Sequence, residues 1–137
     1  MKMQFSIISS RNKNIRIRVK MLQEVVKLHF KIFERRLWDL IFLASLVEWL
    51  MGSRKYELFI AYFKNTPVGF CLMRESRIWQ IGVLKEYRRL GIGSSLAPDY
   101  ATVVKTPKFR VNAIKFYEKL GFKKKKETKR SIWFERS

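Results

Sequence analysis

Residues 83–96 contain the side chains and glycines whose spacing best suits binding chemistry. They read Val-Leu-Lys-Glu-Tyr-Arg-Arg-Leu-Gly-Ile-Gly-Ser-Ser-Leu, which predicts that a strand ends, a turn follows and a helix begins. A helix start presents free backbone N–H groups, and the helix dipole favours an anion there. Gly91 and Gly93 remove Cβ atoms that would hold an anion away from the backbone, while Arg88 and Arg89 add positive charge. The pattern predicts a phosphate-binding turn, although a plain strand-to-helix turn has a similar sequence.

A second segment, residues 112–122, reads Asn-Ala-Ile-Lys-Phe-Tyr-Glu-Lys-Leu-Gly-Phe. Together the two segments resemble the GNAT superfamily of acetyl-CoA-dependent N-acetyltransferases. That family has an (Arg/Gln)-x-x-Gly-x-(Gly/Ala) turn after its fourth strand, and Arg88, Gly91 and Gly93 match it. It also has an Ala-x-x-Phe-Tyr-x-x-x-Gly-Phe segment on its last helix, which Ala113 to Phe122 match. The resemblance extends over roughly Tyr56 to Phe122, and both motifs occur in the family's order.

The resemblance implies a fold and a cofactor. We expect an α+β fold, GNAT-like, with a central, mostly antiparallel twisted sheet flanked by helices, and one acetyltransferase-like domain over residues 1–137. The implied cofactor is acetyl-CoA or coenzyme A. Its expected binding residues are Val83, Arg88, Arg89, Leu90, Gly91, Ile92, Gly93, Ser94 and Tyr117.

The family's chemistry assigns catalytic roles to two of these residues. Attack of an amine on a thioester creates an oxyanion, which needs a preorganised N–H donor; the resemblance places that donor at the backbone near Val83. The leaving thiolate takes a proton, which Tyr117 would supply as a general acid. Such acid assistance is worth roughly 10²–10⁴-fold at most. The alternative interpretation of Tyr117 is a core aromatic beside Phe116.

A general base is harder to identify in this sequence. Many family members carry a carboxylate on the fourth strand, whereas residues 77–83 offer only Gln80. Glu75 is the nearest acid, and its position indicates a surface turn. His29 has a suitable side chain, but its place on an apolar helix favours a hydrogen-bonded, half-buried histidine. A water relay is the remaining alternative.

Two features depart from the family pattern. Asn112 adjoins Ala113 directly, where the family has two residues between them. The segment 94–111 is several residues shorter than is usual in the family, and it contains Pro98, which should end or kink the helix after about two turns. We therefore expect the protein's contacts with the adenosine side of the cofactor to differ from those usual in the family.

Periodicity predicts the elements that hold these residues. Helical spacing from Met21 and again from Leu37 predicts two helices, with a break near Glu34–Arg36 and the second ending at Gly52. Residues 15–19 fit either a strand or a helix entry. A helix over Ala113–Leu120 should stop at Gly121. The predicted strands are Met3–Ile8, Tyr56–Phe63, Val68–Arg74, Arg77–Val83 and Ser131–Glu135, and a short extended piece is expected around Phe109–Val111. The three strands between residues 56 and 83 should form an antiparallel meander, with a turn at 64–67.

The charge is extreme, with 30 Lys and Arg against 11 Asp and Glu, a formal +19. Such a field attracts anions, which could be nucleic acid, a phosphorylated cofactor or an acidic protein surface; a solvated basic surface is the alternative. Lys123–Lys126 reads as a solvated charge run. Trp133 and Phe134 are too sparse to predict a base-stacking platform.

The single cysteine and single histidine limit other chemistry. No intramolecular disulfide can form, no metal site is expected, and Cys71 is predicted to be a small core residue. The start lacks a signal-peptide pattern. The apolar run 37–51 is too short to span a bilayer. We therefore expect a cytoplasmic protein without a membrane partner.

The sequence thus favours an N-acetyltransferase that moves an acetyl group from acetyl-CoA to an amine by direct attack. A basic surface repels polyamines, so a protein N-terminus or lysine is the expected acceptor. Two alternatives stay open. The first is a catalytically weak or inactive coenzyme A-binding protein of the same fold, and the second is a basic nucleic-acid-binding protein.

Overall fold

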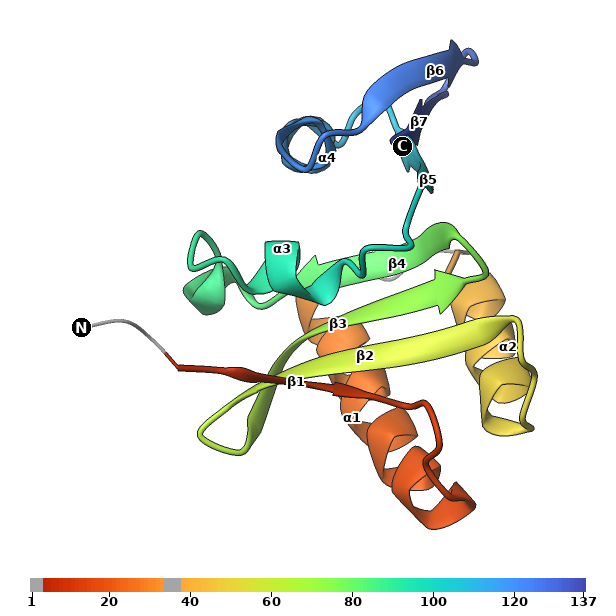
Figure 1. Ribbon diagram of the computed structural model, residues 1–137, viewed down its shortest axis with the longest axis vertical. Helices are drawn as coiled ribbons and strands as arrows, with labels where there is room; N and C mark the ends of the chain where they lie inside the picture. Colours follow the sequence, from red (N-terminus) through yellow and green to blue (C-terminus); the bar gives the residue numbers. More distant parts are fainter. Residues whose placement is uncertain (1–3, 34–37) are drawn as a thin grey trace.

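The computed structural model describes residues 4–33 and 38–137 (Figure 1). Its elements in chain order are β1 (Ser6–Ser9), α1 (Ile15–Ile32), α2 (Trp38–Leu50), β2 (Tyr56–Phe63), β3 (Thr66–Arg74), β4 (Arg77–Val83), a 3₁₀ turn η1 (Lys85–Tyr87), α3 (Ile92–Leu96), β5 (Val103–Pro107), α4 (Val111–Lys119), β6 (Lys123–Glu127) and β7 (Ser131–Glu135). Of the predicted features, Met3, Leu37 and the break at Glu34–Arg36 lie outside the described residues.

The described strands form one seven-stranded sheet in the order β1-β2-β3-β4-β5-β7-β6. Every neighbouring pair is antiparallel except β4 and β5, which are parallel. The predicted α+β fold with a mostly antiparallel sheet is confirmed, and so is the meander of β2, β3 and β4.

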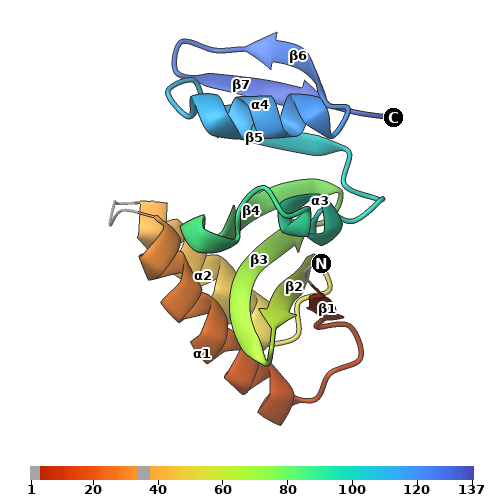
Figure 2. The ribbon, with the colours of Figure 1, turned by 90° about the vertical axis from the view of Figure 1, so that its left-hand side faces the viewer.

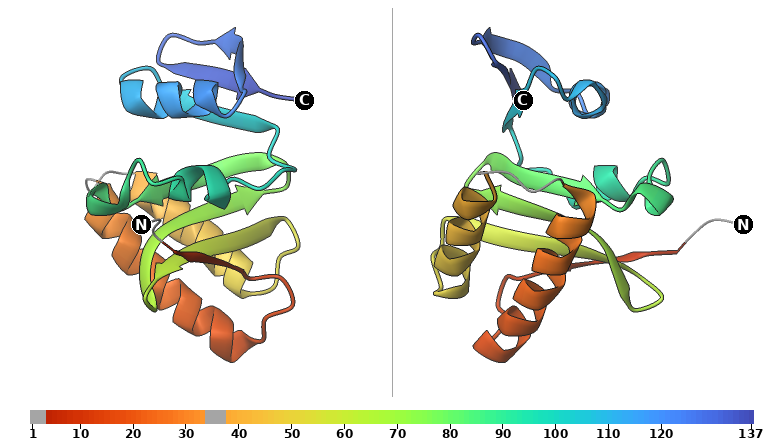
Figure 3. Two further views of the ribbon diagram at one scale, coloured as in Figure 1. Left: turned by 60° about the vertical axis from the view of Figure 1, so that its left-hand side comes forward. Right: turned by 180° about the vertical axis from the view of Figure 1, so that it is seen from behind.

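Helices cover both faces of this sheet. α1 and α2 pack on one face of β2 and β3, as the view from behind shows (Figure 3). α3 and α4 lie on the opposite face, together with the inward side chains of β5 and β7 (Figure 2). Two apolar cores result, one on each side of the sheet, and the phosphate-turn segment belongs to the side of α3 and α4.

α1 begins earlier than its apolar periodicity indicates. Asn14 caps the helix, since its side-chain oxygen accepts a hydrogen bond from Ile17 N at 3.0 Å, which satisfies one of the free N–H groups of the first turn. Residues 15–19, which fitted either a strand or a helix entry, are therefore helical. Met21, Val25 and Leu28 then bury one face of the helix against the sheet.

The hairpin between β2 and β3 is tighter than predicted. Lys64 and Asn65 both adopt the left-handed conformation, with φ of 50° and 64°, as a two-residue hairpin turn requires. β3 therefore starts at Thr66 rather than at Val68. The predicted bounds of β2, β4 and β7 agree with the structure.

A bulge in β4 sets which side chains face each core. Leu72 pairs with Gln80 and Met73 pairs with Ile78, so Trp79 is the extra residue of β4. A bulge reverses the alternation of side chains beyond it. As a result Gln80 faces α1, while Ile81 and Val83 belong to the core under α3 and α4.

The prediction of an extended piece around residues 109–111 is wrong. The strand is β5, which ends at Pro107, a residue without an N–H for further pairing; residues 108–109 form a turn and Val111 begins α4. The predicted helix after it is confirmed with slightly different bounds. Gly121, at φ 95°, follows the helix end as expected.

The lysine run at 123–126 forms most of strand β6, which the sequence did not predict. Every residue of β6 is exposed, so the expectation of a solvated run is confirmed. Lysine has a low strand propensity, but pairing with β7 overrides it.

The described helices include none that is both long and apolar enough to cross a membrane. Within residues 4–33 and 38–137, no group of three His, Cys, Asp or Glu residues is arranged to hold a metal ion. Cys71 is fully buried in the core, as predicted, and burial raises its pKa.

Candidate active site

The sheet splits between β4 and β5. The two strands pair at Arg77–Val103 and at Ile78–Val104, and in the described structure no later residue of β4 pairs with β5. The strands separate beyond this point (Figure 2). The second half of β4 therefore keeps β3 as its neighbour and leaves its other backbone edge facing the split.

Val83 points its backbone N–H into this split. Leu84 N donates to Val68 O across β3 at 2.8 Å, and successive residues of a strand direct their N–H groups to opposite edges. Val83 O also faces away from β3, where it accepts a hydrogen bond from Arg88 Nε at 3.0 Å. The predicted donor is in a suitable position, and Arg88 anchors the turn to the strand end.

The predicted phosphate turn follows directly. Arg89 and Gly91 have φ of 65° and 84°, and a Cβ built on Gly91 meets no atom within 4 Å, so the space beside it is open. The first bond of α3 is Ser95 N to Gly91 O at 3.1 Å. The N–H groups of residues 92–94 therefore have no acceptor within the helix. This backbone is compatible with the predicted phosphate turn, and binding of a phosphate there stays a prediction.

α3 is shorter than expected. It ends at Leu96 after five residues instead of about two turns. Ala97, which precedes Pro98, is extended, with ψ of 112°, because the proline ring disfavours helical geometry in the residue before it. The prediction that Pro98 ends the helix is confirmed, whereas the predicted helix length is wrong.

Gly93 joins the two sequence motifs. A Cβ on Gly93 would lie 3.0 Å from Cε1 of Phe116 on α4. The aromatic ring of the second motif thus packs against the backbone of the first. The absence of a side chain at Gly93 serves this contact, in addition to any approach by an anion.

Tyr117 lies in the same apolar cluster as Ile92 and Leu96 of α3, and Val83 packs against that cluster. Its ring is 6.0 Å from that of Phe122, and its side chain is 7% exposed. Burial raises the pKa of Tyr117, as does the nearby Cys71, while Arg110 opposes the shift. The phenol therefore keeps its proton at neutral pH, as a general acid must.

The structure brings together two polar residues that the sequence left apart. His29 Nδ1 lies 2.7 Å from Oε1 of Gln80, in a hydrogen bond that the amide oxygen accepts. His29 is fully buried rather than half-buried, and its ring stacks on Phe42 at 4.3 Å. The signal in the sequence was one histidine and one glutamine at inward positions of an apolar helix and strand. Glu75 is exposed in a turn, as predicted, and lies at the paired end of β4.

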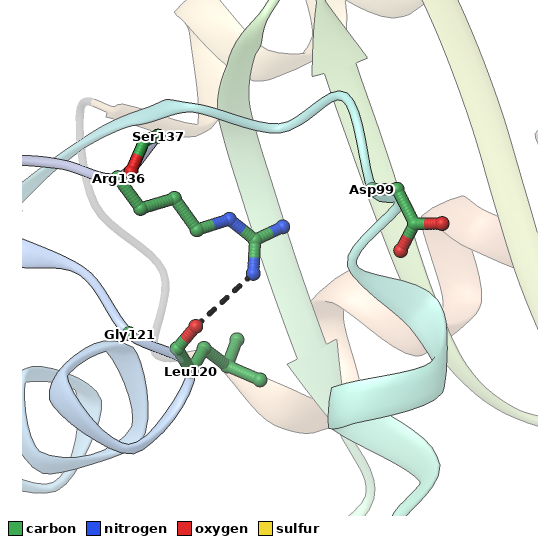
Figure 4. Close-up of a pocket in the computed structure, with 5 residues that line it drawn as sticks. All are labelled: Asp99, Leu120, Gly121, Arg136 and Ser137. Atoms are coloured by element: carbon green, nitrogen blue, oxygen red, sulfur yellow. Dashed lines mark hydrogen bonds between the residues drawn. The ribbon is translucent and has the colours of Figure 1, made fainter.

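Arg136 is a structural residue near the site that sequence reasoning missed. Its guanidinium donates to Pro98 O at 2.9 Å, Ala101 O at 2.6 Å and Leu120 O at 3.2 Å. It lines a surface hollow of about 300 Å³ with Asp99 and Gly121 (Figure 4). Arg136 thereby ties the segment after α3 to the end of α4, the two helices that carry the motifs.

A family model described as "Acetyltransferase (GNAT) domain" matches residues 54–124, just over half of the chain. The chain belongs to the GNAT acetyltransferase family. The matched residues include the split strand, the glycine turn and α4. A search of curated proteins found no match.

Solved structures with the same fold include three acetyltransferases. A putative streptothricin acetyltransferase from Bacillus anthracis, in complex with acetyl coenzyme A, is 26% identical with a TM-score of 0.54; the match covers 61% of this chain and 62% of that one. Naa50 from Arabidopsis thaliana, bound to the bisubstrate analogue CoA-Ac-MVNAL, is 23% identical over 97% of this chain and 98% of that one, with a TM-score of 0.64. The ribosomal-protein-S18-alanine N-acetyltransferase from Escherichia coli is 14% identical over 96% and 92%, with a TM-score of 0.68.

Proposed function

We propose that this chain transfers an acetyl group from acetyl-CoA to an amine of a protein, either an N-terminus or a lysine. The observation that carries the proposal is the adjacency of the glycine turn to the split between β4 and β5. The turn fits a pyrophosphate, and the split presents a free edge of backbone. The B. anthracis relative, crystallised with acetyl coenzyme A, supports the choice of cofactor.

Each predicted site residue has a distinct role in this acetyl transfer. Backbone N–H groups of residues 89–94 hold the pyrophosphate, with Arg89 adding charge and Arg88 fixing the turn to Val83 O. The cofactor supplies the acetyl group as a thioester. Val83 N–H donates to a carbonyl oxygen in the split, where it stabilises developing negative charge. Tyr117 keeps a proton available for the departing sulfur.

The net charge of the protein indicates the class of acceptor. A protein with a formal +19 repels polyamines and aminoglycosides, which are polycations. A protein amine that lies among acidic residues avoids this repulsion. Naa50, whose structure is in complex with the bisubstrate analogue CoA-Ac-MVNAL, supports a protein acceptor on this fold.

The second candidate function is that of a coenzyme A-binding protein that does not transfer the acetyl group. The favouring observation is β4, on which residues 77–83 include no carboxylate and Gln80 is engaged by His29. Such a protein would bind coenzyme A without acetylating any amine. Turnover assays with protein and peptide amines separate it from the enzyme.

The first experiment is calorimetric titration with acetyl-CoA and with coenzyme A, using the wild type, Gly91→Asp and Gly91→Asn. Asp and Asn are similar in size and both tolerate positive φ, so the pair differs mainly in one negative charge. We expect Gly91→Asp to bind at least about tenfold more weakly than Gly91→Asn, because a carboxylate in the turn repels the pyrophosphate. Equal affinity of the two variants, or no binding by the wild type, would reject the turn as the cofactor site.

A further inference from the structure

A row of alternating basic and aromatic side chains crosses the sheet on the face opposite α3 and α4. Its members, here called the cationic ladder, are Arg74, Trp79, Arg77, Trp133 and Lys105. Arg74 Cζ lies 5.1 Å from the Trp79 ring centroid, and Arg77 Cζ lies 4.7 Å from the centroids of both Trp79 and Trp133. Lys105 Nζ lies 5.4 Å from the Trp133 centroid. Arg77 thus lies next to both indoles, and the three cations come from β3, β4 and β5.

The ladder carries an electrostatic cost inside the protein. Arg74 and Arg77 are direct cross-strand partners, and like charges in that position destabilise a sheet. Nε of Arg77 is buried and has no hydrogen-bond partner among the described residues. Burial lowers the pKa of Arg77, and the charge of Arg74 lowers it further. An anion bound near the exposed parts of the two guanidinium groups would offset the repulsion between Arg74 and Arg77.

Within residues 4–33 and 38–137, the carboxylates whose contacts are described do not supply this anion. Glu75 lies in the exposed turn between the two arginines, and Glu135 faces Lys125, with Oε2 and Nζ 4.0 Å apart. Among the described residues, no ion pair joins a carboxylate to Arg74, Arg77 or Lys105. In the described part of the chain, no ion pair therefore offsets the charge of the ladder.

The cationic ladder lies next to the split between β4 and β5. Arg77 belongs to the first paired rung of β4 and β5, from which the strands separate, and Lys105 lies further along β5. α3, α4 and the glycine turn occupy the other face of the sheet. Beside β5 and β7, Figures 1 and 3 show α4 on one side and no described helix on the other. Lys105 directly follows the last residue of β5 that pairs with β4, and Arg77 lies in the paired part next to it. The ladder therefore borders the closed end of the split on the open face of the sheet.

We propose that the cationic ladder binds acidic side chains next to the acceptor amine, so that the substrate class is an acidic polypeptide segment. This proposal rests on the proposed function, because only an acetyltransferase has an acceptor amine. Guanidinium groups suit it, because their planar fork matches a carboxylate. A nucleic acid suits it less, because stacking of bases needs free aromatic faces, and both indoles already have cations over them.

The test compares two C-terminally labelled peptides that are identical except that one begins Met-Asp-Glu-Asp and the other Met-Asn-Gln-Asn. Fluorescence anisotropy without cofactor gives the dissociation constants, and initial rates with acetyl-CoA give kcat/KM. The proteins are the wild type, Arg77→Gln, Lys105→Gln and Lys20→Gln; Lys20 is an exposed lysine of α1 that loses the same charge away from the ladder. Lys105 is exposed, so its variant tests the proposal even where Arg77→Gln perturbs folding.

We expect the wild type to prefer the acidic peptide about tenfold in both measurements. Arg77→Gln and Lys105→Gln should each remove most of that preference, and Lys20→Gln should keep it. Ladder-dependent binding of the acidic peptide without acetyl transfer would support the ladder and reject the enzyme. Acetyl transfer without acidic preference, or preference unchanged in both ladder variants, would overturn the ladder and leave the enzyme standing. Tighter binding of a short oligouridine, lost in the same two variants, would also overturn it, in favour of RNA.

Discussion

A buried tyrosine serves as an acid only if its hydroxyl keeps its proton at working pH and reaches the reacting atoms. The apolar cluster around Tyr117 meets the first condition, since burial and the neighbouring Cys71 raise the pKa of the phenol. The second condition is what separates a catalytic tyrosine from a core aromatic. Ring contacts with Phe116, Phe122 and Phe134 would exist in either case.

Tyr117→Phe distinguishes these interpretations, because it removes the hydroxyl and keeps the ring. We expect kcat to fall by roughly 10²- to 10⁴-fold with little change in the KM for acetyl-CoA, since the proton is needed only when the sulfur departs. The wild-type rate should also hold above pH 10, the ordinary region of tyrosine ionisation, because the raised pKa keeps the phenol protonated. Unchanged kcat in the variant at every pH would identify Tyr117 as a packing residue.

At the scale of elements, two contacts join the helices that carry the motifs. Gly93 of α3 lies under the ring of Phe116 on α4. Arg136 bonds the backbone on both sides, from Pro98 and Ala101 after α3 to Leu120 at the end of α4. α3 has only five residues and therefore few hydrogen bonds of its own. Its position must depend on these two contacts.

Arg136→Met tests this arrangement. Methionine is long enough to keep some contact with the Phe122 ring, over which Arg136 Cζ lies at 4.6 Å, but it cannot donate to the three carbonyls. We expect a loss of about 1–3 kcal/mol in stability and weaker binding of acetyl-CoA, measured by thermal unfolding and calorimetry. Arg130→Met, at an exposed position between β6 and β7, makes the same chemical change and should alter neither. If the two variants behave alike, Arg136 does not position α3.

The elements also show what the sequence could predict. The meander, the glycine turn and α4 follow from period and turn residues, which act over short distances. β6 could not be predicted in this way, because a run of lysines becomes a strand only through its pairing with β7. The contacts of His29 with Gln80, and of Arg136 with three carbonyls, join residues far apart in the chain. Such contacts depend on packing, on which local pattern carries no information.

At the scale of the whole molecule, 11 acidic residues offset 30 Lys and Arg, so each paired carboxylate matters more than in a balanced protein. Glu57 on β2 is the most connected of those described. It accepts hydrogen bonds from the Ser9 hydroxyl, from Tyr100 Oη at 2.6 Å and from Arg11 Nη2 at 3.0 Å. It therefore links β1 and the segment before β5 to the central sheet.

The pKa of Glu57 follows from these contacts. Burial alone raises it, but the hydrogen bonds from Ser9, Tyr100 and Arg11, with the charge of Arg11, outweigh burial and lower it. A carboxyl whose pKa is lower in the folded state stabilises the fold above its unfolded pKa, about 4.3 for glutamate. That stabilisation is lost as the pH falls through the lower folded value.

We therefore expect Glu57→Gln to cost about 1 kcal/mol at pH 7, a value reduced for partial solvation of the carboxylate. The difference from wild type should persist down to about pH 5 and shrink below the glutamate value of about 4.3. Urea unfolding at pH 7, 5 and 3 measures it. Glu86→Gln, an exposed side chain, makes the same change in net charge. Because added salt screens general repulsion, 0.3 M NaCl should diminish any effect of Glu86→Gln more than that of Glu57→Gln. Equal losses in both variants at every pH would mean that net charge, rather than the Glu57 contacts, governs acid stability.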